Sequence, residues 1–260
     1  MDRMKVVWNS FLTAFAMFSK IPVPRADWTK ENMKYMVCFF PGVGAVAGLL
    51  VWIYGRICEA AGFGSLMRAA GLVLIPVLVS GGIHLDGYLD TMDALSSYQP
   101  RERKLEILKD SNAGAFAVIM GCVWFVLALG VWSEIGAASL PVAALGCIVS
   151  RALSGIALAA FPCANKKGSL SMFADAAAKR VVYVVLAGWL VLAAVLGCMT
   201  DWKLTLLMFL AAGAVYIYYY HMAMKEFGGT TGDIAGFFLE CCELAIALAV
   251  MLGGKFLCYW

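Results

Sequence analysis

Three aspartates lie close together at the end of a long apolar run. Asp86, Asp90 and Asp93 are four and three residues apart, so in a helix with about 100° per residue they share one face. Carboxylates grouped beside hydrocarbon repel one another and are costly to keep there unless a cation lies among them. A hard divalent metal that also bridges phosphate oxygens suits such a group. The spacing predicts that the three aspartates are catalytic residues and metal ligands.

The same stretch allows other interpretations. Acids near a helix amino terminus also interact favourably with the helix dipole, so capping and solvation are the alternative for the aspartates. His84 lies roughly on the opposite helix face from Asp86; it either orients a ligand or lies at the membrane interface. Gly87 either allows a ligand or helix to approach closely or is a turn glycine.

Residues 109–116 precede a second apolar run and open on the same side as the aspartates. Ser111 or Asn112 is a natural helix cap. A helix amino terminus with a lysine beside it, here Lys109, also binds anions. We expect phosphate binding at this segment.

Arg151 lies near the middle of another apolar run, where an arginine costs at least ~2.5 kcal/mol on insertion scales. It should pair with an acid or face a polar cavity. We expect a role at the site, and a structural ion pair is the alternative.

Residues 228–236 hold four glycines around Asp233. Backbone N–H groups of such a loop can bind an anion while the acid holds the metal. Glu240 follows Asp233 by seven residues and Glu243 comes three later, so a helix would place all three acids on one face.

The composition predicts an all-α, polytopic membrane protein with a single domain over residues 1–260. Of the 260 residues, 63% are hydrophobic and 14% are charged, whereas soluble domains carry about 25% charged residues. A single globular core could not bury so much apolar surface, so the lipid bilayer is the main solvent. The net charge is only +3, and no nucleic-acid partner is expected.

An amino-terminal helix over residues 4–19 should lie in the membrane interface, and the prolines after residue 21 should end it. About seven membrane spans are expected after it, each near the length needed for a ~30 Å core. These spans are residues 36–55, 67–83, 113–133, 138–161, 181–199, 204–224 and 237–253.

The basic residues predict the orientation. Fifteen of the twenty lysines and arginines fall on the side of the amino terminus and the acidic stretch, four fall on the other side, and Arg151 lies within a span. Because basic loops stay inside, the amino terminus and the acidic stretch are expected to face the cytoplasm.

Together, these motifs resemble the cobalamin-5′-phosphate synthase family, also called adenosylcobinamide-GDP ribazoletransferases. The similar segments are His84-Leu85-Asp86-Gly87-x-x-Asp90-Thr91-x-Asp93, Lys109-Asp110-Ser111-x-x-Gly114, Arg151, Thr231-Gly232-Asp233-x-x-Gly236 and the opening Phe18-Ser19-Lys20-Ile21-Pro22-Val23-Pro24. Ala94 and Ala117 stand where the family commonly has glycine, and both are small-for-small changes.

The resemblance implies late assembly of cobalamin in the inner membrane of a prokaryote. Adenosylcobinamide-GDP would be joined to α-ribazole or its 5′-phosphate, GMP would leave, and Mg²⁺ would be required. Asp86, Asp90, Asp93 and Asp233 would hold the metal, with one member of the cluster accepting the hydroxyl proton. The residues expected to bind substrate are His84, Lys109, Asp110, Ser111, Arg151, Thr231, Gly232 and Glu240.

Two other functions compete with this one. A CDP-alcohol phosphotransferase-like enzyme also places spaced aspartates on membrane helices, but its motif has an Ala-Arg pair where Leu89-Asp90 stands here. A cation-coupled transporter would need acids near the membrane midplane. The sequence leaves open the form of the ribazole, the number of Mg²⁺ ions and whether the chain forms a homo-oligomer.

Overall fold

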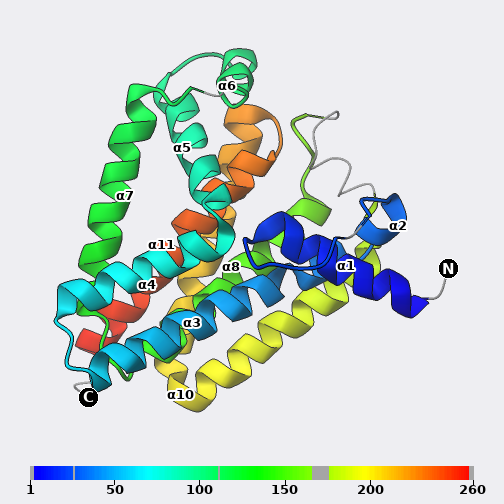
Figure 1. Cartoon of the computed structure of the whole chain (residues 1–260). Coiled ribbons are helices and arrows are strands. Elements are labelled where there is room, and N and C mark those ends of the chain that lie inside the picture. Colours follow the sequence, from blue (N-terminus) through cyan, green and yellow to red (C-terminus); the bar gives the residue numbers. More distant parts are fainter. Residues whose placement is uncertain (1–2, 26, 111, 166–175, 258–260) are drawn as a thin grey trace.

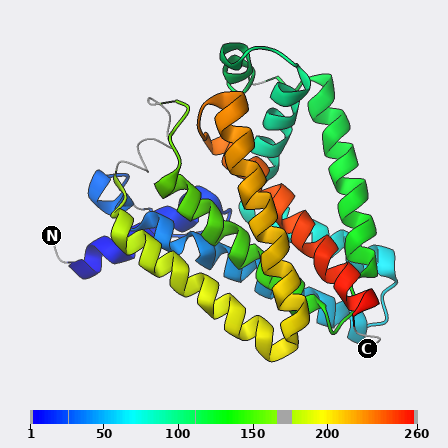
Figure 2. The same ribbon diagram turned by 180° about the vertical axis from the view of Figure 1, so that it is seen from behind.

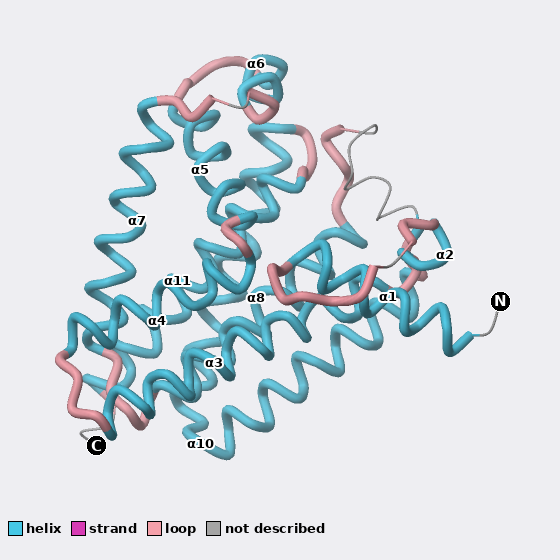
Figure 3. Tube along the Cα trace, viewed as in Figure 1, coloured by secondary structure: helices cyan, strands magenta, loops and turns pink. Residues whose placement is uncertain are grey.

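The computed structural model describes residues 3–25, 27–110, 112–165 and 176–257. Within these residues the structure is helical, and the extended backbone pairs only at an isolated bridge between Cys163 and Thr230 (Figure 3). The elements are α1 (Arg3–Phe18), α2 (Lys30–Met33), η1 (Met36–Phe39), α3 (Phe40–Ala60), α4 (Ser65–Ser80), α5 (Ile83–Ser96), α6 (Arg101–Ile107), α7 (Ala115–Glu134), α8 (Leu140–Ala160), α10 (Lys179–Met222), η2 (Ala223–Phe227) and α11 (Gly232–Phe256). The all-α prediction is confirmed.

Five helical segments are long and apolar enough to cross a membrane, and α4 with α5 makes a sixth if the bent pair is one span. The chain is therefore a multi-pass membrane protein. The count differs from the predicted seven for two reasons. The expected spans 181–199 and 204–224 are two arms of α10, and the expected span 67–83 falls mainly in α4, which is too short to cross alone.

Asp201 separates the two arms of α10. Its backbone is extended (φ −157°, ψ 111°), and its carboxylate accepts hydrogen bonds from the N–H groups of Lys203 (2.8 Å) and Leu204 (3.0 Å). The side chain thus caps the second arm as an N-cap residue does. Figure 2 shows the two arms diverging from this point.

A pair of glycines turns the chain by 95° between α4 and α5. Gly81 (φ +68°) and Gly82 (φ +81°) both adopt the left-handed conformation, which glycine enters without a Cβ penalty. The Lys20 N–H donates to the Val79 carbonyl at 2.8 Å and ties the end of α1 to this turn. The turn directs the acidic face of α5 toward α11 and away from α4.

Helix α8 forms the centre of the bundle. Its backbone lies so close to α3 that a Cβ at Gly44 would be 2.1 Å from the Cys147 carbonyl oxygen. Helices α10 and α11 also pack on α8, and α5 packs on α11. The amino-terminal segment is a helix as expected, and α1 packs on η1 and α3.

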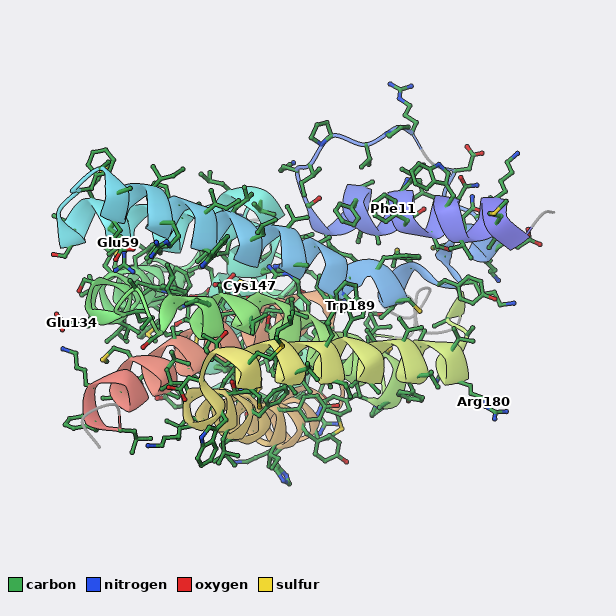
Figure 4. The ribbon with its side chains drawn as sticks, turned by 90° about the horizontal axis from the view of Figure 1, so that it is seen from below. Phe11, Glu59, Glu134, Cys147, Arg180 and Trp189 are labelled. Carbon is green, nitrogen blue, oxygen red and sulfur yellow. The ribbon has the colours of Figure 1, made fainter. Side chains whose placement is uncertain are left out.

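The α3–α4 and α7–α8 loops lie at one end of the molecule, near the C-terminus, and the loops on either side of α6 lie at the opposite end (Figure 1). At the lysine-poor end, Lys255 pairs with Glu134 and Arg68 donates to the Ile135 carbonyl at 2.8 Å. At the other end, Lys104 pairs with Glu226 at 2.5 Å. In Figure 4, Glu59 and Glu134 mark the first end and Arg180 the second.

Candidate active site

Three other carboxylates, from α5 and α11, lie within electrostatic reach of Asp90 on α5. Asp86, Asp90 and Asp93 are all on α5, as predicted, and Asp233 lies in the first turn of α11. The Asp90 carboxylate is close enough to Asp86, Asp233 and Asp93 to feel repulsion from each of them. We call these four residues the carboxylate cluster.

Two glycines allow α5 and α11 to approach this closely. A Cβ at Gly87 would be 2.7 Å from the Asp233 carbonyl oxygen, and one at Gly236 would be 2.8 Å from the His84 carbonyl oxygen. Real Cβ atoms essentially never make contacts under 3.0 Å, so any larger residue would push the helices apart. Of the two interpretations of Gly87, the close approach of a neighbouring helix is correct.

Asp93 also contacts the amino terminus of α7. A Cβ at Gly114 would be 2.2 Å from Asp93 Oδ2, and the Ala117 N–H donates to Asp93 Oδ1 at 3.3 Å. A negative charge there interacts favourably with the helix dipole. Asp93 therefore holds the start of α7 against α5, and its predicted catalytic role stays a prediction.

The segment before α7 differs from the expected cap. Gly114 occupies the N-cap position of α7, whereas Asn112 donates to Asp110 through its backbone N–H (3.0 Å) and Nδ2 (2.8 Å). These two hydrogen bonds lower the pKa of the exposed Asp110 carboxyl. Lys109 is exposed, and Ser111 lies outside the described residues.

The glycine-rich loop positions Asp233. Thr231 is the N-cap of α11: its hydroxyl oxygen accepts from the Ile234 N–H at 3.3 Å, and its O–H donates to Asp233 Oδ2 at 3.3 Å. Gly232 is the first residue of α11. The neighbouring Thr230 N–H donates to the Pro162 carbonyl at 2.9 Å, which fixes the loop to the end of α8.

Arg151 forms a buried ion pair. It is 1% exposed, and its Nη1 donates to Glu243 Oε1 at 2.5 Å and to the Cys147 carbonyl at 2.9 Å. Ser150 donates to the same Glu243 oxygen at 2.8 Å. The expectation that Arg151 pairs with an acid is confirmed, and these contacts match the structural alternative; its role toward substrate stays a prediction. The sequence predicted that Glu243 shares a helix face with Asp233 and Glu240, but it did not identify Glu243 as the partner of Arg151.

Glu240 is also buried, and it interacts electrostatically with Glu243 and Arg151. These interactions place it beside the ion pair in the core. A substrate contact for Glu240 stays a prediction.

A cavity of about 180 Å³ opens beside the cluster. Asp86 and Asp233 both line it, together with Gly232 and His84. His84 is buried, and its Nε2 has no hydrogen-bond partner within the described part of the chain. The cavity joins segments far apart in the sequence, so no local pattern could have revealed it.

A wider groove of about 560 Å³ shares Asp86 and Ile83 with the cavity. Lys20 lines this groove, and its side chain lies over the glycine turn, because a Cβ at Gly81 would be 2.4 Å from Lys20 Cγ. A lysine here offers a cation beside Asp86. In the sequence, Lys20 stands out only as part of the motif Phe18–Pro24.

The donor atoms of the cluster suit magnesium. They are carboxylate oxygens that repel one another, and Mg²⁺ prefers oxygen ligands. Among the described residues, no three His, Cys, Asp or Glu side chains are already arranged as metal ligands. The expected set of four aspartate ligands is therefore not preassembled here, and it stays a prediction; Mg²⁺ is often held by one or two carboxylates together with substrate phosphates.

Comparisons with known proteins agree over nearly the whole chain. The profile of a family described as cobalamin-5-phosphate synthase matches residues 10–251. An adenosylcobinamide-GDP ribazoletransferase of Lachnoclostridium phytofermentans is 44% identical over 251 residues, 96% of each chain. One from Pseudomonas entomophila is 34% identical over 93% of this chain and 98% of its own. No solved structure matches the chain.

Proposed function

The chain belongs to the cobalamin-5-phosphate synthase family, and we infer from this that it joins adenosylcobinamide-GDP to α-ribazole or its 5′-phosphate. GMP is released, and the product is adenosylcobalamin or its 5′-phosphate. The observation that supports this activity in the structure is the convergence of four carboxylates from α5 and α11 beside a cavity. The family assignment leaves no support for the CDP-alcohol phosphotransferase and transporter alternatives.

In this proposal, Asp86 and Asp233 hold Mg²⁺, because both line the cavity. The Asp90 carboxylate adds a further negative charge close to them. The metal, when bound, offsets negative charge on the diphosphate of the donor. Lys20 in the adjoining groove and Lys109 on the loop before α7 add positive charge for the phosphates. Phosphoryl transfer asks the protein mainly for such positioning and neutralisation.

The bond changes are those of an in-line displacement. The ribazole 3′-hydroxyl oxygen attacks the phosphorus attached to cobinamide, and the bond from that phosphorus to the GMP oxygen breaks with its electron pair leaving on GMP. The hydroxyl proton passes to Asp90 or Asp93, the two cluster members that we do not assign to the metal.

We place the site on the cytoplasmic face of the inner membrane. Helix α5, which carries three of the four carboxylates, packs on α6, where Lys104 pairs with Glu226, and basic loops remain on the cytoplasmic side. Cysteines introduced singly at exposed Tyr98 and Phe63 should be labelled from opposite sides by an impermeant maleimide; labelling from the same side would contradict this topology.

The direct test is GMP release by the purified protein in proteoliposomes supplied with adenosylcobinamide-GDP, α-ribazole and Mg²⁺. Asp86→Asn and Asp233→Asn should each lower turnover at least ~100-fold, the order of loss seen when one preorganised charged group is removed. The control is Asp27→Asn, an exposed aspartate outside the cluster. Absence of GMP release by the unaltered protein would refute the proposed function.

A further inference from the structure

The cavity beside the carboxylate cluster has two chemically different parts. Asp86 and Asp233 line it, whereas most of its other lining residues are apolar. The apolar lining comes from α1, η1, α3, α8 and α11, through Met17, Phe18, Val37, Phe40, Leu158 and Leu239. A ligand that fits both parts must itself be apolar at one end and polar at the other.

The size of the cavity suits a small aromatic ring system. Its volume is about 180 Å³, and a dry protein cavity of roughly 150 Å³ lined by apolar side chains binds benzene. Phe18 and Phe40 form part of its wall with ring centroids 4.1 Å apart, and the His84 ring lies 5.8 Å from that of Phe40. Such aromatic walls favour a flat ring that stacks or meets them edge to face.

One polar atom in this lining lacks a partner. His84 is 6% exposed, and its Nε2 makes no hydrogen bond within the described residues. Buried polar atoms are nearly always satisfied by protein, water or ligand. Nε2 itself has less than 1 Å² of accessible surface, so a ligand in the cavity contacts His84 through the rest of the residue.

We propose that this cavity binds the aromatic base of the ribazole acceptor. This inference rests on the proposed function. The benzimidazole of α-ribazole is flat and largely apolar, so it matches the aromatic and aliphatic side chains that line the cavity. With the base inside, the ribose lies beside Asp86 and Asp233, where its hydroxyl meets the donor diphosphate. The cavity therefore selects the acceptor, and the adjoining groove that contains Lys20 is left for the donor.

Filling the cavity tests this assignment. Ala235→Leu and Ser154→Leu each add apolar volume to a residue that lines it, and Ala187→Leu adds the same volume as the first on an exposed face of α10. With the donor saturating, both cavity variants should raise the KM for α-ribazole at least tenfold and leave the KM for adenosylcobinamide-GDP unchanged. The Ala187→Leu variant should match the unaltered protein in both constants.

A second substrate separates a blocked pocket from a damaged fold. The riboside of imidazole has a smaller base, so Ala235→Leu should lower kcat/KM for α-ribazole at least tenfold more than for imidazole riboside. An unchanged KM for α-ribazole in both cavity variants, with GMP still released, would overturn the inference and leave the proposed function intact. Equal losses of kcat/KM for both ribosides would overturn it too. A loss of activity that varies with the chain length of the vesicle lipids and not with the riboside would also overturn it. Failure of the unaltered protein to release GMP would instead refute the proposed function.

Discussion

The contact between α5 and α11 at Gly87 gives the sharpest prediction. In Gly87→Ala, the new Cβ would be 2.7 Å from the Asp233 carbonyl oxygen and 2.8 Å from its Cα, whereas ordinary contacts lie at 3.4–4 Å. The two helices must therefore separate by roughly 0.5–1 Å, and a misplacement of about 1 Å in an active site can cost ~100-fold in rate. We expect kcat for GMP release to fall by about that factor.

Stability should change much less than activity in this variant. Overpacking a helix contact costs ~1–3 kcal/mol, partly offset by the ~0.5–1 kcal/mol that alanine gains over glycine in a helix. The matched control is Gly188→Ala on α10, where a Cβ would meet nothing within 4 Å; it should keep full activity. Thermal unfolding in detergent and GMP release would be measured on all three proteins. If Gly87→Ala retains activity within threefold of the unaltered protein, the close helix contact does not position the carboxylates.

Three further predictions follow from other contacts. Replacing either partner of the buried pair, by Arg151→Met or Glu243→Gln, leaves an uncompensated buried group and should lower the free energy of unfolding by ~3–5 kcal/mol. In thermal unfolding, the double variant should lose less stability than the two single losses added together. Additive losses would contradict the pairing. Asp201→Ala removes the cap of the second α10 arm and should cost ~0.5–2 kcal/mol with GMP release unchanged; equal stability would show that the bend needs no cap. Asp86→Asn should raise the Mg²⁺ concentration for half-maximal activity at least tenfold. Asp93→Asn weakens the contact with α7, so it should lower kcat at saturating Mg²⁺ without shifting that concentration. Identical Mg²⁺ curves for the two variants would refute the proposal that Asp86 binds the metal and Asp93 positions α7.

Local patterns in the sequence predicted what depends on helix geometry. The i, i+4, i+7 spacing of the α5 aspartates placed them on one face, and the hydropathy placed most spans. The cost of a charge in an apolar run predicted that Arg151 pairs with an acid. Its partner could not be chosen among Asp233, Glu240 and Glu243, because the choice depends on how α8 and α11 pack.

Features formed by several distant segments were beyond the sequence. Asp93 meets Ala117 across 24 residues, so its contact with α7 depends on the turn between the helices. Asn112, one of the two residues considered as an alternative cap, is not the N-cap of α7: Gly114 occupies that position, and Asp93 supplies the carboxylate from another helix. By contrast, the expected spans 181–199 and 204–224 are present as the two helical arms of α10 on either side of Asp201, where Thr200 and Lys203 also interrupt the apolar pattern.

The amino-terminal helix has a consequence for how the protein can be shortened. Met17, Phe18 and Lys20 form walls of the cavity and the groove, although α1 is not among the segments long enough to cross a membrane. A chain that starts at residue 30 would keep every candidate span and should still insert into a bilayer. It would lack one wall of the cavity and of the groove, so the shortened protein should enter the membrane but not release GMP.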